Sequence, residues 1–214
     1  MKPFLFINMA MTLDGKVSRP DGKWYGLNTI SDKKKMDTIR AKADAIIVGK
    51  SSILNDDPVV TIRYTYCPKP PRPIILLQKS TLPKNRKIFS TNPIIFCTVQ
   101  NYSKIQDELG DVSEIHCISD SSAISPILVI EKLVGLNYQK ILLEGGPKLN
   151  YSFLAEDLVD KLYVTIVPFI IGKNTLPAIV DGSSEFTNFD KKKWKLISVE
   201  KEKEEIFLEY EKIF

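Results

Sequence analysis

The chain has 214 residues, of which 43% are hydrophobic and 26% charged, and its formal net charge is +4. This balance is typical of a globular protein with a sizeable core, and it argues against a strongly basic nucleic-acid-binding surface. No apolar run reaches the length of a membrane span, no secretory signal is recognisable, and the three cysteines lack metal-ligand spacing. We therefore expect a cytoplasmic protein with reduced thiols.

The predicted elements alternate between apolar strands and helices. Along the chain we expect a strand at residues 3–9, a helix capped by Ser31 or Asp32, a strand at 45–48, a helical turn at 51–55, an extended segment at 59–64, strands at 74–77, 94–99 and 115–118, a helix at 125–134, a strand at 141–143, a helix from Pro147, a strand at 162–167, and polar strands at 194–201 and 204–214. This order favours a mainly parallel sheet flanked by helices, with an antiparallel C-terminal strand pair. We expect one α/β domain over residues 1–214.

The reactive side chains restrict the possible chemistry. His116 is the only histidine, and no Cys-x-x-Cys pair accompanies it, so a zinc enzyme is not expected and we assign no metal ligands. No Gly-x-Ser-x-Gly turn marks a serine hydrolase. We therefore expect the chemistry to come from a molecule that the protein binds.

The most informative segment is residues 140–150, Lys-Ile-Leu-Leu-Glu-Gly-Gly-Pro-Lys-Leu-Asn. A short strand, a Gly145-Gly146 turn and a helix that begins near Pro147 direct several backbone N–H groups at one point, where the helix dipole attracts phosphate. Glu144 lies at the mouth of this turn. The same pattern also occurs in ordinary βα turns, so the other loops must decide between the two interpretations.

Two further loops follow predicted strands at the edge where parallel sheets bind ligands. In the first, Asn8 offers an amide, and the small Ala10 would let a flat ring approach the backbone; a plain turn explains the segment equally well. In the second, Ser51 and Ser52 can cap a helical turn, and the Asp-Asp pair at 56–57 suits magnesium, ribose hydroxyls or a simple Asx-Pro turn.

Two arginines are candidates for binding phosphate. Arg40 is a basic residue on an apolar helix face, and Arg63 ends the extended segment at 59–64. A guanidinium can grip a phosphate with two parallel hydrogen bonds. Surface ion pairs are the alternative for both residues.

Seven motifs occur in one order along nearly the whole chain. They are Met11-Thr-Leu-Asp-Gly-Lys16, Ile39-Arg-Ala41, Asp44-Ala-Ile-Ile-Val-Gly49, Ser52-Ile-Leu-Asn-Asp-Asp-Pro-Val-Val-Thr-Ile-Arg63, Leu143-Glu-Gly-Gly-Pro-Lys-Leu149, Leu158-Val-Asp-Lys-Leu162 and Pro168-Phe-Ile-Ile-Gly172. In this combination the chain resembles the pyrimidine reductases of riboflavin biosynthesis, whose fold is similar to dihydrofolate reductase.

The resemblance implies an NADPH-dependent reduction of a phosphorylated ribosylaminopyrimidine to its ribitylamino form, with hydride passing to C1′ of the opened sugar, and it implies a homodimer. By position it implies cofactor contacts from Ala10, Ser52, Asp56, Gly145, Gly146, Pro147, Lys148, Leu149 and Asn150, and substrate contacts from Arg40, Val60, Arg63 and Glu144. Asn8 and Glu144 are the candidate catalytic side chains, and water is a third possible source of the proton.

Some positions depart from the family pattern. Gln78 replaces a polar residue expected near the adenosine, which leaves NADPH and NADH both open, and Gly26 falls where the bacterial two-domain members carry an aromatic residue near Trp24. Asn8 resembles the stand-alone type, which favours a substrate not yet deaminated. The alternatives are a related reductase acting on another pterin-like heterocycle and a non-catalytic nucleotide-binding module.

Overall fold

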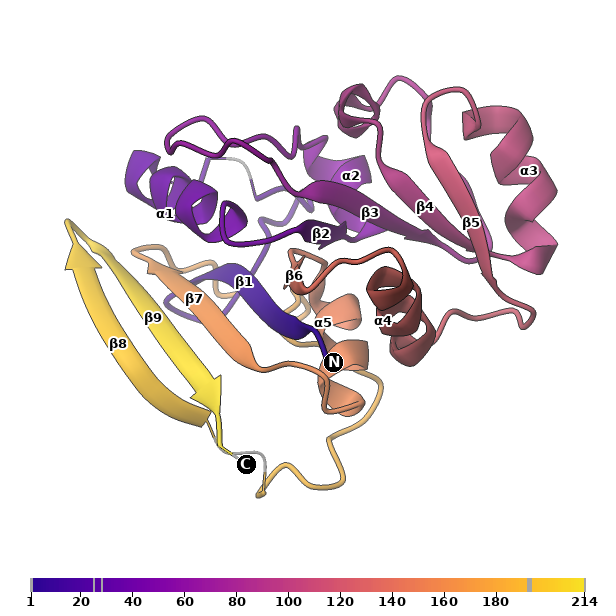
Figure 1. Ribbon diagram of the computed structural model, residues 1–214. Coiled ribbons are helices and arrows are strands. Elements are labelled where there is room, and N and C mark those ends of the chain that lie inside the picture. Colours follow the sequence, from indigo (N-terminus) through magenta and orange to yellow (C-terminus); the bar gives the residue numbers. More distant parts are fainter. Residues whose placement is uncertain (1, 25, 28, 192–193, 214) are drawn as a thin grey trace.

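A computed structural model describes residues 2–24, 26–27, 29–191 and 194–213. Within these ranges nine strands form one sheet in the order β5-β4-β3-β2-β6-β1-β7-β9-β8 (Figure 1). The strands are β1 (Phe4–Thr12), β2 (Ala45–Val48), β3 (Arg72–Leu77), β4 (Ile94–Thr98), β5 (Glu114–Ser119), β6 (Lys140–Leu143), β7 (Lys161–Val167), β8 (Trp194–Glu202) and β9 (Glu205–Lys212). Strands β1 to β7 are mutually parallel, and β9 pairs antiparallel with both β7 and β8. The predicted mainly parallel sheet with an antiparallel C-terminal pair is confirmed.

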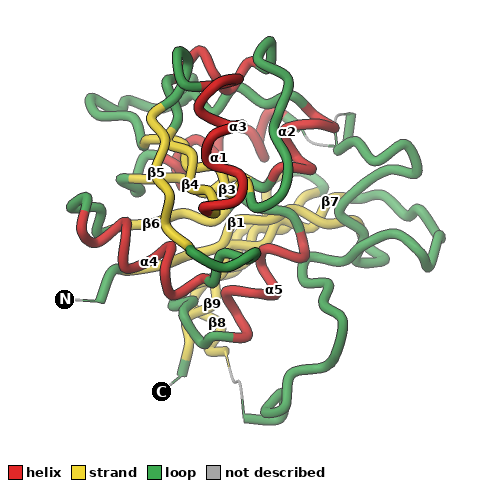
Figure 2. Tube along the Cα trace, turned by 90° about the vertical axis from the view of Figure 1, so that its right-hand side faces the viewer, coloured by secondary structure: helices red, strands yellow, loops and turns green. Residues whose placement is uncertain are grey.

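Helices cover both faces of the sheet (Figure 2). They are α1 (Ile30–Arg40), α2 (Lys50–Asp56), α3 (Val99–Leu109), α4 (Pro126–Gly135) and α5 (Pro147–Ala155), with a 3₁₀ helix at Lys87–Thr91. Apolar side chains of α1, α2 and α3 pack on one face, around Ile46, Ile75 and Ile95. Those of α4 and α5 pack on the other face, around Ile47 and Ile74. Strand residues alternate between the two cores because successive side chains point to opposite faces.

Unequal strand lengths in the middle of the sheet leave one edge of β1 uncovered. β1 pairs with β6 only over Phe4–Ile7, whereas it pairs with β7 from Phe6 to Thr12. The second half of β1 therefore has a neighbouring strand on one side only. In a parallel sheet such a place, beyond the carboxyl ends of neighbouring strands, is where ligands bind.

The predicted N-cap of α1 was wrong, and the segment after α2 joins no strand of the sheet. The N-cap is Thr29, whose Oγ1 accepts hydrogen bonds from the N–H groups of Ser31 (3.1 Å) and Asp32 (3.3 Å). A threonine at this position satisfies two unpaired helix donors, so the helix begins before the predicted caps. Residues 59–64 form no strand, and their end is tied to α1 instead, since Asp37 Oδ2 accepts from the N–H of Arg63 (2.6 Å) and of Tyr64 (3.0 Å).

Helix α3 was not predicted, and Val99, expected to end a strand, is its first residue. Its apolar side is narrow, with Ile105 and Leu109 fully buried, and the third buried residue is Asn101, whose amide donates to the carbonyls of Leu77 (3.2 Å) and Ser80. Such a polar anchor does not contribute to a hydrophobic pattern. The remaining predicted elements are present within a few residues of the expected bounds; position 214 lies outside the described residues.

The first and last of the seven motifs meet at the end of β1. Thr12 Oγ1 donates to Asp14 Oδ1 (2.5 Å), and the Asp14 carboxylate accepts from the N–H groups of Ile171 (3.2 Å) and Gly172 (2.7 Å). The hydroxyl of Thr12 and these amides lower the pKa of Asp14 to about 2. This link fixes the segment that follows β7, which includes Leu176 and Pro177, beside the uncovered half of β1.

Candidate active site

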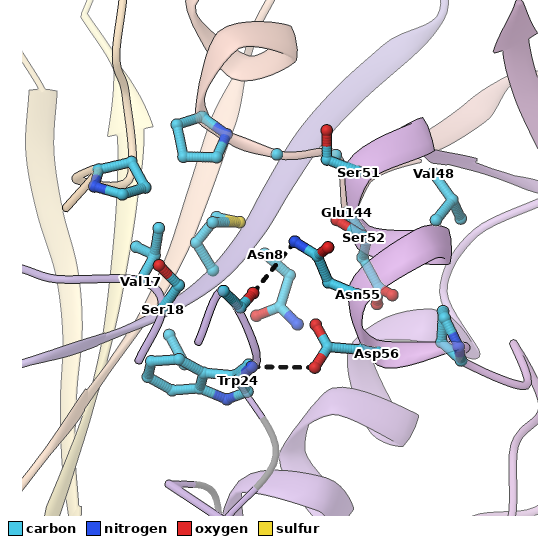
Figure 3. A pocket seen from close by; sticks show the side chains of 18 of the residues that line it. Asn8, Val17, Ser18, Trp24, Val48, Ser51, Ser52, Asn55, Asp56 and Glu144 are labelled. Carbon is cyan, nitrogen blue, oxygen red and sulfur yellow. Dashed lines mark hydrogen bonds between the residues drawn. The ribbon is translucent and has the colours of Figure 1, made fainter. Parts of the chain in front are cut away.

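A cavity of about 570 Å³ lies over the second half of β1, beyond the carboxyl ends of β2 and β6 (Figure 3). Ten of the predicted site residues line it, namely Asn8, Ala10, Arg40, Ser52, Asp56, Val60, Glu144, Gly145, Gly146 and Pro147. Four predicted residues, Arg63, Lys148, Leu149 and Asn150, do not line it. The cavity thus unites segments that are up to 169 positions apart in the sequence, from Asn8 to Pro177, and it lies at the edge of the sheet where such ligand sites are expected.

The floor of the cavity is the uncovered part of β1. Within a parallel strand, alternate residues direct both backbone groups to the same neighbour. The N–H of Phe4 donates toward β6, to Gln139 O (2.8 Å), whereas the N–H of Leu5 donates toward β7, to Asp160 Oδ2 (2.9 Å). Ala10 lies an even number of positions after Phe4, so its backbone groups point to the same side as those of Phe4. On that side β6 has already ended. The strand therefore offers a donor and an acceptor to a flat ring.

A buried ion pair connects α1 with the turn after β6. The Arg40 guanidinium donates to Glu144, with Nη2 at 2.6 Å from Oε2 and Nε at 2.9 Å from Oε1, and it also reaches Thr61 O (3.3 Å). Asp37 lies 3.9 Å from the same guanidinium. Burial alone would lower the pKa of Arg40, but the charges and hydrogen bonds of Glu144 and Asp37 outweigh it and raise this pKa. Arg40 is therefore a permanent cation with its charge compensated inside the protein.

The two predicted phosphate-binding arginines occupy different environments. Arg40 is 5% exposed and directs its hydrogen bonds to Glu144, so it orients a carboxylate in the cavity. Arg63 is exposed and its guanidinium lies 5.7 Å from the centre of the Tyr64 ring, outside the cavity lining. Of the two, only Arg63 presents its guanidinium to solvent.

Gly145 and Gly146 serve the turn in different ways. A Cβ on Gly145 would lie 2.3 Å from Leu149 Cδ2, so this glycine allows the turn to pack on α5. A Cβ on Gly146 would meet no atom within 4 Å, so the space beside it is open. Across the turn, a Cβ on Gly49 would lie 2.9 Å from the Gly146 nitrogen. The starts of α2 and α5 therefore touch backbone to backbone.

The predicted phosphate cradle is smaller than expected. The N–H groups of Leu149 (2.9 Å) and Asn150 (3.1 Å) donate to the carbonyl of Gly146, and the buried Asn150 amide donates to Ile179 O (2.8 Å). These two residues hold the helix and the neighbouring loop together, and their amides are not directed at the cavity. The N–H groups of Gly146 and Lys148 have no backbone acceptor among the described residues. The cradle is thus confined to the first turn of α5.

Several cavity residues escaped the sequence analysis because no motif marks them. The loop at 17–24 closes one side of the cavity over α2, where the N–H of Trp24 donates to Asp56 Oδ1 (2.9 Å) and Asn55 Nδ2 donates to Gly22 O (3.1 Å) (Figure 3). Asp57 turns away and accepts from the N–H of Lys87 (2.9 Å), so the two aspartates do not form a joint magnesium site. In the described part of the chain no group of three or more metal-ligating side chains is found.

One stripe of α1 forms the roof of the cavity. Asp32, Met36 and Arg40 all line it and are spaced four residues apart, which places them on one face of the helix. The spacing would have revealed the stripe, but Asp32 was interpreted only as a possible cap. Burial raises the pKa of Asp32 to about 6, although the nearby Thr165 hydroxyl favours the ionised form, and the nearby charge of Glu205 adds to the rise.

We predict that the Arg40–Glu144 pair behaves as a unit in unfolding. Arg40→Met or Glu144→Leu alone should lower the free energy of unfolding by about 3 to 5 kcal/mol, because each leaves a buried charge without its main partner, whereas the double variant should regain most of this loss. Urea unfolding of the four proteins measures the coupling. Glu108→Ala, which removes an exposed pair with Lys104, serves as the control and should change stability by less than about 0.5 kcal/mol. Strictly additive losses would contradict the prediction.

Comparison with known proteins identifies the family. Residues 3–208 match the RibD C-terminal domain. The chain is 31% identical over 186 residues to the 2,5-diamino-6-ribosylamino-4(3H)-pyrimidinone 5′-phosphate reductase of Methanothermobacter thermautotrophicus, covering 85% of each protein. It also superimposes on the deaminase/5-amino-6-(5-phosphoribosylamino)uracil reductase of Thermotoga maritima with a TM-score of 0.83 at 26% identity, covering 99% of this chain and 57% of that one.

The fold extends to a more distant group of enzymes. Dihydrofolate reductase from Enterococcus faecalis superimposes with a TM-score of 0.52 at 12% identity, over 99% of this chain and 98% of that one, which supports the predicted dihydrofolate-reductase-like architecture. In the described residues no helix has the length and apolar character needed to cross a membrane. The match along nearly its whole length shows that the chain belongs to the RibD C-terminal domain family.

Proposed function

We propose that this protein reduces a ribosylaminopyrimidinone 5′-phosphate to its ribitylamino form with NADPH, as a step of riboflavin biosynthesis. The observation that carries the proposal is a single cavity with two chemically distinct sides. One side has an uncovered strand edge and an open glycine at the start of α5, and the other has a carboxylate held by a buried arginine. Membership of the RibD C-terminal domain family supports the same assignment.

The residues on the first side suit a dinucleotide. Ala10 would bind the carboxamide of a nicotinamide through its backbone groups, and Ser52 and Asp56 on α2 would contact the same half of the cofactor. The open space at Gly146 and the nearby N–H groups suit a pyrophosphate, which binds well at the start of a helix. Bound NADPH would supply a hydride from C4 of its nicotinamide.

The residues on the second side suit a polar sugar. The Glu144 carboxylate is fixed by Arg40 and would accept a hydrogen bond from a ribose hydroxyl, while Val60 offers apolar contact. Arg63, whose guanidinium faces solvent, would bind the 5′-phosphate at the rim. Asn8 extends from β1 between the two sides and would hold the opened sugar against the ring. Asn8 and Glu144 are the side chains from which we expect the proton to be delivered or positioned.

Positioning supplies much of the rate in such a reaction. Holding the two reacting carbons at roughly 3 to 3.5 Å replaces a bimolecular encounter by a unimolecular step. The rigid parts of the cavity, namely β1, the Arg40–Glu144 pair and the contact between Gly49 and Gly146, suit this task because none of them depends on a long exposed loop.

The proposal is tested by anaerobic incubation of the protein with NADPH and the ribosylamino substrate. We expect absorbance near 340 nm to fall as the ribitylamino product forms, with product identity checked by mass spectrometry. NADH in place of NADPH tests the cofactor preference. Unchanged absorbance with both cofactors, although NADPH binding is detected by fluorescence, would exclude this substrate and leave a nucleotide-binding module.

We predict that Gly146→Ala weakens cofactor binding without harming the fold. Gly146 has φ −73°, which alanine adopts readily, so the added methyl group fills the open space where we place the pyrophosphate. The dissociation constant of NADPH, measured by fluorescence titration, should rise on the order of tenfold or more, as expected for overfilling a tight site. Gly135→Ala at the end of α4 is a matched control with equally open surroundings and should bind NADPH normally. Unchanged affinity of Gly146→Ala would place the pyrophosphate elsewhere.

We predict a homodimer formed through the C-terminal hairpin. β8 is an edge strand, and it exposes Leu196 (46%), Ile197 (43%) and Val199 (57%). Uncovered edge strands with apolar side chains tend to pair or to be covered by another chain. Light scattering should give twice the mass of one chain at micromolar concentration, and Val199→Lys should lower the measured mass toward that of one chain. A monomeric wild-type protein would contradict this assignment.

A further inference from the structure

Asp37 is a buried acid of α1 that lies outside the cavity lining and has no part in the reaction as proposed so far. Its side chain is 0% exposed, and Oδ2 accepts hydrogen bonds from the backbone N–H groups of Arg63 (2.6 Å) and Tyr64 (3.0 Å). Oδ1 has no hydrogen-bond partner among the described residues and lies 3.9 Å from Arg40 Nη1. A carboxylate loses hydration on burial, and here two amides and one neighbouring cation offset that cost.

The two residues that Asp37 holds belong to a long connection without regular structure. Residues 57–71, between α2 and β3, contain neither a helix nor a strand, and they pass beside α1 (Figure 1). Within the described part of the chain, the hydrogen bonds that tie residues 58–71 to other segments come from two side chains of α1, Asp37 and Arg40. Loops of this length are usually functional or disordered. The contacts to α1 therefore decide where the middle of this loop lies.

Asp37 fixes the backbone of an arginine and of the aromatic residue beside it. The guanidinium of Arg63 lies over the Tyr64 ring, 5.7 Å from its centre, which is within the range of a cation–π contact. A guanidinium over a ring keeps the N–H groups in its own plane free for other acceptors. Arg63 is exposed and has no ion-pair partner among the described residues. The buried acid thus holds in place a cation whose charge is not compensated.

The arginine held in this way lies at the rim of the cavity. Val60 lines the cavity, and three residues of chain span at most about 11 Å, so the Cα atom of Arg63 lies within that distance of the lining. Asp37 and Arg40 lie one turn apart on α1 and grip the same short stretch. Arg40 holds its inner end at Thr61 O (3.3 Å), and Asp37 holds its outer end.

A phosphate is bound most tightly when its cation is already in place. A mobile loop loses conformational freedom when it binds a ligand, and this loss of entropy weakens the affinity. Hydrogen bonds to a charged, buried acceptor impose the order on Arg63 before a ligand arrives. Arg40 does not serve as this anchor, because its own hydrogen bonds go to Glu144 and Thr61. Asp37 would therefore raise the affinity for a phosphorylated sugar without contacting it.

We propose that Asp37 is a positioning residue for recognition of the 5′-phosphate, because it holds the backbone of Arg63 where the guanidinium meets the phosphate at the rim. The inference rests on the proposed reductase function. It deepens that function by naming how the same site distinguishes a phosphorylated ribosylamine from the dephosphorylated riboside.

The decisive experiment measures kcat/KM for the ribosylaminopyrimidinone with and without its 5′-phosphate. The ratio of the two values is the phosphate preference, and it is compared in the wild type, Asp37→Ala, Arg63→Met and the double variant. In Asp37→Ala the preference should fall on the order of tenfold, mainly through KM for the phosphorylated form, because the ligand must then order the loop. It should fall at least as far in Arg63→Met. The double variant should match Arg63→Met, since Asp37 acts through Arg63.

Asp44→Ala is the matched control. Asp44 Oδ2 accepts from the N–H groups of Gln139 (3.0 Å) and Lys140 (2.8 Å), so one carboxylate oxygen again holds two consecutive amides, but at the amino ends of β2 and β6. This substitution should lower stability and keep the wild-type phosphate preference. Asp37→Asn tests rescue, because its amide oxygen still accepts from both N–H groups, and it should retain more of the preference than Asp37→Ala.

A second measurement uses only the wild-type protein and so does not depend on the folding of a variant. Amide hydrogen exchange, followed by NMR, should be slow at Arg63 and Tyr64 although both residues are exposed, since their N–H groups bond a buried acceptor. Thr65 of the same loop has no hydrogen bond from its N–H among the described residues, and it should exchange fast.

The outcomes separate the two proposals. Reduction of neither form of the substrate would overturn the reductase function, and the role of Asp37 with it. Reduction with an unchanged phosphate preference in Asp37→Ala, an equal fall of that preference in Asp44→Ala, or a further fall in the double variant beyond Arg63→Met would leave the reductase function intact and exclude the positioning role. Exchange at Arg63 and Tyr64 as fast as at Thr65 would exclude it as well.

Discussion

The buried ion pair between Arg40 and Glu144 holds the two sides of the cavity together. Arg40 ends α1 and Glu144 follows β6, so the pair fixes the roof of the cavity against its wall. Two charges removed from water are tolerated only when further hydrogen bonds satisfy them. Thr61 O accepts a hydrogen bond from the arginine, and Asp37 adds a negative charge 3.9 Å away. The same Asp37 ties down residues 63 and 64. One cluster thus positions a helix, a turn and a loop.

The cavity itself exists because neighbouring strands have unequal lengths. β2 and β6 contain four residues each, whereas β1 between β6 and β7 contains nine. Gly49 and Gly145 follow the two short strands. Their turns approach so closely that a Cβ on Gly49 would lie 2.9 Å from the backbone nitrogen of Gly146. The glycines therefore let two helices start side by side above the exposed half of β1. A longer β6 would cover Ala10 and close the site.

Much of this architecture was predictable from local patterns, and the parts that were not depend on distant contacts. The apolar runs and the Gly-Gly-Pro sequence predict the strands and the start of α5, because these features act within a few residues. The loops and the family resemblance together predicted ten of the residues that line the cavity. The pairing of Arg40 with Glu144 joins residues 104 positions apart, and no local pattern distinguishes it from a phosphate site. The place of Asp32 in the cavity lining was missed for a related reason, since Thr29 caps the helix and the acid is turned inward toward Thr165.

The distribution of charge suggests how a cavity rich in acids can serve anionic ligands. Asp32, Asp56 and Glu144 line it, whereas Arg40 is compensated by Glu144 and Asp37. Phosphate groups placed among these carboxylates would be repelled. Under the proposed function, the uncharged parts of the two ligands, a nicotinamide, a sugar and a pyrimidinone, would therefore lie in the interior, and their phosphates would lie at the ends. There the first turn of α5 offers backbone N–H groups and Arg63 offers an exposed guanidinium, so the proposed ligands would each have a phosphate-binding group at one end of the cavity.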